Sequence, residues 1–277
     1  MLIPVLSMYN LTGYMKMLEN ILNWLPENNR IERIWLMAKF DFVTRYYGSF
    51  LGLFWALLKP LFQLLIYYFV FTVIFKNSTE HFLMFLFVGI ILFQFFTEAA
   101  AGSLKIFQSK RYLLENIQIN RLDIFYAAIC ATFIGFLFNF IAFSVGNLFL
   151  NDSFSWSILL FPLVIVNLVV LILAAQLILS TISIFLKDID NIWFLVTTLL
   201  FWGSGIFFDL NELTGKAALI MYFNPLAGIL TNARSVLVYA EPLNINLFLI
   251  NFSTSIIFLL IGLWLFKNYS SKALEKI

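Results

Sequence analysis

The sequence predicts an all-α integral membrane protein. We expect six transmembrane helices, an N-terminal interfacial amphipathic helix, and two short re-entrant half-helices between spans 5 and 6. The chain of 277 residues is 62% hydrophobic and 12% charged, whereas a soluble domain has about 25% charged residues. A helix needs about 20 apolar residues to cross roughly 30 Å of hydrocarbon, and the apolar runs of this chain are long enough to do so. They also lack the alternating pattern of barrel strands.

The apolar runs predict one transmembrane domain that covers residues 1–277. Its parts are a cytoplasmic N-terminal region with the interfacial helix (1–50), the six spans (53–266) and a cytoplasmic tail (267–277). The predicted spans are 53–75, 82–101, 124–150, 158–185, 192–208 and 245–266. No long linker, internal repeat or low-complexity tract divides the chain.

Residues 31–47 are predicted to form the interfacial helix. Apolar and aromatic residues share one helical stripe, and the stripe comprises Ile31, Ile34, Trp35, Ala38, Phe42 and Tyr46. Because Trp and Tyr concentrate at membrane interfaces, we expect this helix to lie in the cytoplasmic interface. An ordinary surface helix is the alternative.

The first predicted span contains a Lys59-Pro60 pair inside an otherwise apolar run. Lysine is costly in hydrocarbon, but Lys59 lies about two turns into the span and can extend its amine to the interface. Pro60 removes one backbone hydrogen bond, so we expect a kink near the start of the helix. Both features are also explained by the way the helix enters the membrane, without a functional role.

Residues 217–239 are apolar but are interrupted by Asn224-Pro225, and Arg234 lies near their end. Each half is shorter than a span needs to be, which is typical of re-entrant segments. With six spans, 14 of the 17 Lys and Arg residues lie on the side of both termini. The positive-inside rule therefore predicts cytoplasmic termini, whereas a seventh span would place the C-terminal lysines outside.

Several classes of function lack their sequence signature. The chain contains no G-x-x-x-x-G-K-[ST] phosphate loop, so we expect no ATP hydrolysis by this chain alone, and it contains no G-x-S-x-G nucleophile elbow. With one Cys and one His, neither an internal disulfide nor a His-rich metal site is expected. Asp188 and Asp190 match a D-x-D pattern, but capping of a short loop or contact with a partner is the favoured interpretation. We expect no metal, no bound cofactor and, at a net charge of +2, no nucleic-acid partner.

Residues 102–123 form a longer connection than two adjacent helices require. Its charged side chains include Lys105, Lys110, Arg111 and Glu115. The length favours docking on a cytoplasmic protein over a role in topology alone. Glu98, just before this connection, is an intramembrane carboxylate and so a functional candidate, but a salt bridge or extension to the interface is the favoured interpretation.

The chain is rich in aromatic residues, with 34 Phe, 11 Tyr and 7 Trp. Positions facing lipid or the core explain most of them, but a minority have the chemistry to line a conduit, because aromatic rings stack on the C–H faces of sugars. The candidates are Trp55, Phe201, Trp202, Phe207, Phe208 and Tyr222. For any one of them, a lipid-facing or core position is the simpler interpretation.

Two motifs resemble the transmembrane subunit of ABC-2 type exporters, in the branch that moves lipid-linked polysaccharides such as O antigens, teichoic acids and capsular glycans. The family pattern Gly-x-(Leu/Phe)-Trp-x-x-Leu-x-Pro-Leu is matched by Gly52, Phe54, Trp55, Leu58, Pro60 and Leu61. The second motif, Asn-Pro followed by an arginine, is matched by Asn224, Pro225 and Arg234. The chain departs from the family at 204–208, where Ser-Gly replaces Ser-Pro or Thr-Pro before the aromatic pair.

The resemblance implies a permease subunit in the cytoplasmic (inner) membrane of a bacterium. It would form a homodimer, with two copies of a separate ATPase that bind ATP and Mg. The interfacial helix and the 102–123 loop would contact the ATPases, and the half-helices would cap the outer exit. A conduit at the dimer interface would carry the glycan, and Arg45 and Lys59 are candidates to attract its lipid pyrophosphate. A small-molecule or drug exporter, a membrane-embedded transferase that uses Asp188 and Asp190, and a channel or scaffold remain alternatives.

Overall fold

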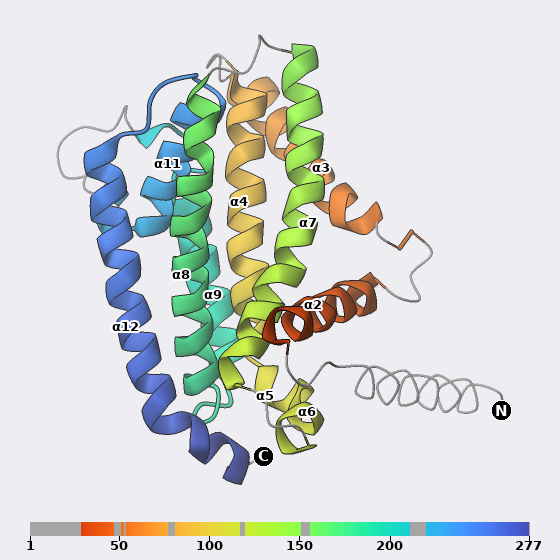
Figure 1. Ribbon diagram of the computed structural model, residues 1–277. Helices are drawn as coiled ribbons and strands as arrows, with labels where there is room; N and C mark the ends of the chain where they lie inside the picture. Colours follow the sequence, from red (N-terminus) through yellow and green to blue (C-terminus); the bar gives the residue numbers. More distant parts are fainter. Residues whose placement is uncertain are drawn as a thin grey trace.

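The computed structural model describes residues 29–46, 51–52, 54–76, 81–116, 120–150, 156–210 and 220–276, and these residues form helices and no strand (Figure 1). The all-α membrane class predicted from the sequence is therefore confirmed. Among the described residues, five helices are long and apolar enough to cross a membrane: Phe54–Ile74, Phe82–Gly102, Arg121–Phe149, Trp156–Ile182 and Ile245–Ser270. The count of six spans stays a prediction.

The helices form an elongated bundle. In chain order they are α2 (Arg30–Tyr46), α3 (Phe54–Phe69) with its π-helical end η1 (Val70–Ile74), α4 (Phe82–Gly102), α5 (Ile106–Ser109), α6 (Arg111–Asn116), α7 (Arg121–Leu150), the 3-10 turn η2 (Trp156–Leu160), α8 (Phe161–Ile182), α9 (Ile189–Gly203), α10 (Ile220–Phe223), α11 (Pro225–Leu237) and α12 (Ile245–Lys276). Figure 1 shows α2, α5, α6 and the end of α12 at one end of the bundle, and α11 towards the other. We call these the α2 end and the α11 end.

Helix α4 lies at the centre of the bundle. Residues 84–93 are all buried, as expected for a helix that is apolar on every side, and α4 contacts α3, α7, α8, α9 and α11. Towards the α2 end, one face of α4 becomes accessible at Gln94, Thr97, Glu98 and Ala101. These positions follow the i, i+3, i+4, i+7 spacing of a single helical face, so the polar residues of α4 all point the same way.

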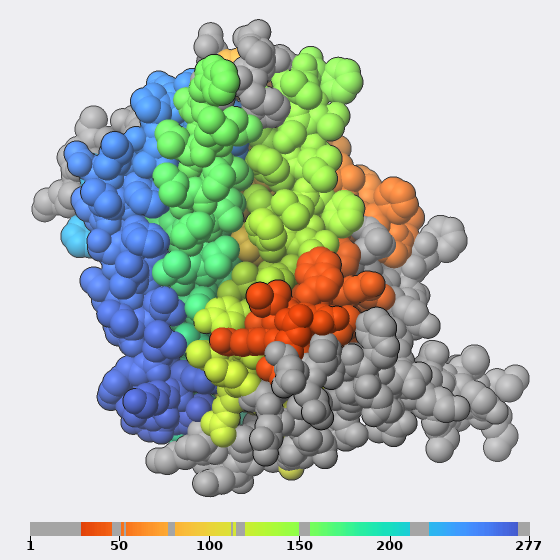
Figure 2. Space-filling view, viewed as in Figure 1, coloured from red at the N-terminus to blue at the C-terminus, as the bar shows by residue number. Residues whose placement is uncertain are grey.

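Helix α2 lies across the lower part of α7, as Figure 2 shows. Its buried face is formed by Met37, Ala38 and Phe42, which pack with residues of α6 and α7. Ile31 and Trp35 of the predicted stripe are exposed instead. The predicted stripe is therefore divided, since Ala38 and Phe42 pack on protein while Ile31 and Trp35 point outwards. The interfacial position of α2 stays a prediction.

The fifth predicted span, 192–208, was wrong at its C-terminal end. Helix α9 has 15 residues and ends at Gly203, so at about 1.5 Å per residue it is about 22 Å long, shorter than the hydrocarbon layer. It ends because Gly205 has a φ of 70°, a left-handed conformation that glycine adopts at little cost. The chain then turns, and residues 206–208 lie outside the helix.

The other boundaries differ less from prediction. Helix α7 begins at Arg121 rather than at 124, and α8 ends at Ile182 rather than at 185. The last helix was predicted to end at 266 but continues to Lys276. The predicted re-entrant segment contains two short helices, α10 and α11, separated at Asn224.

Pro60 lies inside α3 and leaves the carbonyl of Ala56 without its usual helical donor. The side-chain amide of Asn139 on α7 supplies the missing hydrogen bond: its Nδ2 lies 3.0 Å from the oxygen of Ala56. Asn139 and Ala56 are both buried, so this hydrogen bond lies inside the protein. A side chain from a different helix thus stabilises the proline break.

Replacing Asn139 tests this compensation. We expect Asn139→Leu to lower the free energy of unfolding by about 1–3 kcal/mol, because a buried carbonyl loses its partner. In a Pro60→Ala background, the new N–H at position 60 can donate to Ala56, so the same change should cost less. A double-mutant cycle measured by unfolding in mixed micelles gives the difference. Equal costs in both backgrounds would contradict the assignment.

Candidate functional site

An open cavity of about 540 Å³ lies at the α2 end, between α2, the first turns of α3 and the accessible face of α4. It is lined by Arg45, Trp55, Ala56, Lys59, Gln94, Glu98 and Ala101. Three of the predicted site residues, Arg45, Trp55 and Lys59, therefore lie around one space. Lys59 of the Lys59-Pro60 pair therefore belongs to its wall.

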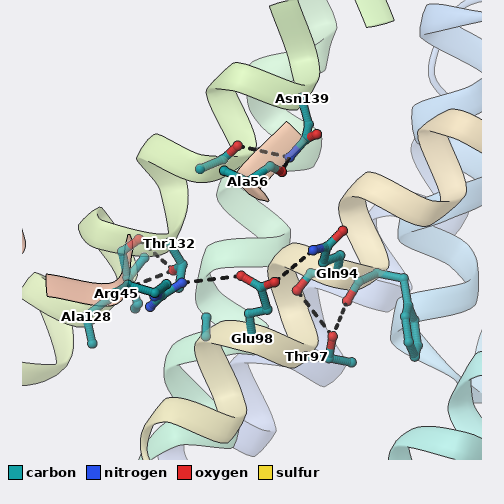
Figure 3. A network of polar contacts seen from close by, with 12 residues as sticks. Arg45, Ala56, Gln94, Thr97, Glu98, Ala128, Thr132 and Asn139 are labelled. Atoms are coloured by element: carbon teal, nitrogen blue, oxygen red, sulfur yellow. Dashed lines mark hydrogen bonds and ion pairs between the residues drawn. The ribbon is translucent and has the colours of Figure 1, made fainter. Parts of the chain in front are cut away.

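The cavity contains two cationic side chains and one carboxylate. Arg45 Nη1 lies 3.3 Å from Glu98 Oε2, and the side chains are 35% and 41% exposed. The other carboxylate oxygen of Glu98 accepts a hydrogen bond from Gln94 Nε2 at 2.7 Å (Figure 3). With Lys59 included, the wall is positive by one formal charge, which suits an anionic ligand next to an aromatic ring and alkyl groups.

The aromatic candidates are divided between two places. Trp55 lies in the cavity, whereas the rings of Phe201 and Trp202 lie 5.2 Å and 5.0 Å from that of Phe207. Phe207 also packs on Tyr67 and Phe71 of α3 and its end, and it is only 3% exposed. Phe207 is thus a core residue of this chain and presents no surface to a conduit.

The remaining aromatic candidates do reach the surface. Trp202 is 56% exposed, Phe208 39% and Tyr222 36%. Trp202 and Phe208 flank the turn that ends α9, and Tyr222 lies in α10. These three side chains are free to meet lipid, a second subunit or a transported chain.

The predicted exit motif is a tightly bonded junction. Arg234 on α11 is 2% exposed, and its guanidinium donates to three backbone carbonyls: Phe85 on α4 (Nε, 3.1 Å), Gly205 (Nη1, 2.6 Å) and Ile206 (Nη2, 3.0 Å). It also stacks on the Phe85 ring, 3.5 Å from the ring centre. The arginine therefore joins α11, α4 and the turn after α9.

Gly89 gives Arg234 the space that it occupies. A Cβ atom on Gly89 would lie 2.5 Å from Arg234 Nη2, closer than van der Waals contact permits. Asn224 completes the junction, because its Oδ1 caps α11 at the N–H groups of Leu226 and Ala227. Its Nδ2 donates to Ser204 Oγ at 3.0 Å.

Pro225 occupies the first turn of α11, where a missing N–H costs nothing. The Asn-Pro pair is therefore the N-cap of α11. Asn224 contacts Ser204, and Arg234 contacts Gly205 and Ile206. Both residues thus hold the segment 204–206, where the sequence departs from the family pattern.

The 102–123 connection forms two short helices, α5 and α6, and its lysines bind other elements of the same chain. Lys105 Nζ lies 3.1 Å from Asp190 Oδ2 at the start of α9, and Lys110 forms an ion pair with Asp41 on α2. Arg111 is exposed on α6. The side chain of Glu115 lies outside the described residues.

Helix α2 is fixed to α7 by a buried carboxylate. Asp123 is fully buried; its Oδ1 accepts from Arg30 Nε at 2.8 Å, and Arg33 Nη2 lies 3.8 Å from its Oδ2. The hydrogen bond with Asp123 raises the pKa of Arg30. Through Asp123 and Asp41, α2, the 102–123 connection and α7 make one bonded unit at the α2 end.

Comparison with known families identifies the chain. The family model described as ABC-2 type transporter matches residues 32–238, which is most of the chain and includes both motifs. The chain belongs to the ABC-2 type transporter family. The recognition made from the two motifs is confirmed.

Curated relatives agree with the family. The chain is 26% identical over 207 residues to the O-antigen export system permease protein RfbA of Myxococcus xanthus, covering 72% of this chain and 80% of that one. Two RfbA permeases of Klebsiella pneumoniae are 26% and 25% identical over 238 residues, covering 85% of this chain and 91% of each relative.

Several residues of this ABC-2 chain were missed as members of the site. Gln94 and Asn139 carry no sequence motif: Gln94 acts through Glu98, one turn further along α4, and Asn139 acts through Ala56 on a different helix. Among the described residues, no group of three or more His, Cys, Asp or Glu side chains is placed to hold a metal. Asp190, considered for a metal from the sequence, instead pairs with Lys105.

The Arg234 junction is tested by filling the space beside it. We expect Gly89→Ala to destabilise the chain by about 1–3 kcal/mol, because the new methyl group displaces the guanidinium from its carbonyls. Gly102→Ala is the matched control on the same helix, since a Cβ there meets no atom within 4 Å. Thermal unfolding in detergent measures both. A Gly89→Ala melting temperature equal to that of the control would contradict the junction.

Proposed function

We propose that this ABC-2 chain is the permease subunit of an ATP-driven exporter that moves lipid-linked polysaccharide, an O antigen or similar cell-surface glycan, across the inner membrane of a bacterium. Three relatives named O-antigen export permeases, matched over most of their length, support this substrate class. The observation that carries the proposal is the cavity where Arg45, Trp55 and Lys59 meet.

Each component of the cavity suits a lipid-linked glycan. Arg45 and Lys59 provide charge-assisted donors for a diphosphate, and Trp55, 37% exposed, provides a face for the first sugars or the polyprenyl chain. We propose that the headgroup enters from the bilayer through the open side of the cavity. We assign this end to the cytoplasm, since the positive-inside charge of the sequence concentrates there.

The conduit would form between two copies of the chain. Helix α3 leaves Phe62, Leu65, Ile66 and Phe69 at least 57% exposed, and α9 leaves Phe194, Leu195 and Leu199 at least 61% exposed. These surfaces are apolar enough to face lipid or a second subunit. In the dimer, Trp202 and Phe208 would lie where they could contact a glycan that passes the end of α9.

The ATPase would act on the bonded unit at the α2 end. Helices α5 and α6 lie beside α2 at that end of the bundle (Figure 1), and Lys110 and Lys105 connect them to α2 and α9. A movement of this unit would therefore shift the cavity wall through Arg45 on α2. It would also shift α9, and with it the aromatic residues at the end of that helix, through the Lys105–Asp190 ion pair. Two copies of the ATPase, each with ATP and Mg bound, would produce this movement when they close.

Reconstitution tests the proposed function. The chain and its candidate ATPase, in proteoliposomes, should show ATPase activity that rises with a polyprenyl-diphosphate-linked oligosaccharide. We expect Arg45→Ala and Trp55→Ala to lower this stimulation about ten-fold, because each removes a direct contact, while membrane insertion persists. Phe75→Ala, an exposed position at the far end of the first span, is the control.

Two results would contradict the proposal. One is wild-type stimulation in both cavity variants, which would remove the cavity from the mechanism. The other is stimulation by small apolar compounds and none by the lipid-linked glycan, which would indicate a small-molecule exporter of the same family.

A further inference from the structure

We propose that Glu98 is a built-in counter-anion of the cavity: it competes with the ligand for Arg45 and so sets a threshold that a lipid headgroup must exceed to bind. The inference rests on the proposed function and deepens it. Its ligand is a phosphate-bearing lipid headgroup, and the threshold separates the polyprenyl diphosphate from the monophosphate headgroups of abundant anionic phospholipids.

The Glu98 carboxylate lies in the wall of the cavity, beside Arg45. Glu98 lies on the accessible face of α4, and both it and Arg45 line the same cavity. Its Oε2 accepts a hydrogen bond from Arg45 Nη1 at 3.3 Å. An anion that binds Nη1 of Arg45 must therefore replace Glu98, and an anion that binds elsewhere on the guanidinium is still repelled by the nearby carboxylate.

The ion pair between Arg45 and Glu98 is weak enough for a ligand to replace it. Both side chains are more than one third exposed, and pairs of this kind contribute little net free energy because water solvates each partner. A diphosphate carries more charge than a carboxylate and offers oxygens to both nitrogen edges of a guanidinium. A diphosphate can thus displace Glu98, whereas a single phosphodiester gains little over it.

Gln94 holds the Glu98 carboxylate in place. Gln94 lies one turn before Glu98 on α4 and donates to Oε1 at 2.7 Å, so Glu98 keeps one hydrogen bond after Arg45 leaves. Figure 3 shows this row, with Arg45 and Gln94 on opposite sides of the Glu98 carboxylate. The carboxylate therefore stays in the wall and can recapture Arg45 when the ligand moves on.

The threshold matters because the cavity is open and the chain lies among anionic phospholipids. Phospholipid headgroups are present at high local concentration, and an unguarded pair of cations would bind them. Glu98 lowers the affinity for every anionic headgroup by a similar factor. The phosphodiester then falls below its binding range, while the diphosphate, with its higher intrinsic affinity, still binds.

The test measures binding to the full-length chain in nanodiscs. The probe is a radiolabelled polyprenyl diphosphate oligosaccharide, first in phosphatidylcholine and then with phosphatidylglycerol as competitor. We expect Glu98→Gln to bind the probe about five-fold more tightly, because the competing ion pair and the repulsion are removed, and to become sensitive to phosphatidylglycerol. Glu98→Asp, which keeps the charge, should retain resistance to phosphatidylglycerol.

Controls separate this effect from a change in fold. Thr97 lies on the same face of α4, and within the described residues its hydroxyl donates to the carbonyls of Phe93 and Gln94 of its own helix. The affinity of Thr97→Ala should therefore equal that of the wild type. A melting temperature for each variant verifies folding.

Each outcome bears on a different claim. Equal probe affinity in wild type and Glu98→Gln, with no competition by phosphatidylglycerol in either, would overturn the inference and leave the proposed function standing. No saturable binding of the diphosphate probe by the wild type would overturn the proposed function itself, and the inference with it.

Discussion

Hydrocarbon offers no hydrogen-bonding partner, so every backbone carbonyl that a helix break exposes must find a donor inside the protein. This constraint explains the polar side chains of the bundle. Asn139 donates to Ala56 where Pro60 breaks α3, and Gln176 donates at 2.8 Å to Ala99 near the end of α4. Arg234 donates to Gly205 and Ile206 where α9 ends. In these three places, a side chain of another helix supplies the donor.

The same constraint ties the two ends of the bundle to α4. At the α11 end, Arg234 and the space left by Gly89 join α11 to α4. At the α2 end, Gln94 and Glu98 of α4 form one wall of the cavity. A rigid central helix thus connects the proposed doorway and the proposed exit, and the exposed helices α3 and α9 flank it. Motion during export would then fall on these outer helices and not on the core.

The sequence predicts the long spans well, because a run of apolar residues has few other stable arrangements in a membrane. It also groups Arg45 and Lys59 as entry candidates, and Trp55, predicted separately as a conduit candidate, lines the same cavity because it lies between them in the chain. The end of α9 could not be predicted, because the turn at Gly205 depends on Arg234, which lies 29 residues further on. Glu98 and Arg45 are 53 residues apart, so their contact also needed the fold. Phe207 could not be told apart from the exposed aromatic candidates by sequence, because its core position depends on packing against Tyr67 of α3.

The central claim is that α10 and α11 fold back at the outer face, so that the α2 end and both termini face the cytoplasm. Single cysteines in a Cys130→Ser background, probed with a membrane-impermeant maleimide on intact cells, test this most directly. The account predicts labelling at Lys76→Cys and Glu241→Cys, and labelling at Lys187→Cys and Lys267→Cys only after the membrane is opened. Labelling of Lys267→Cys in intact cells would contradict it.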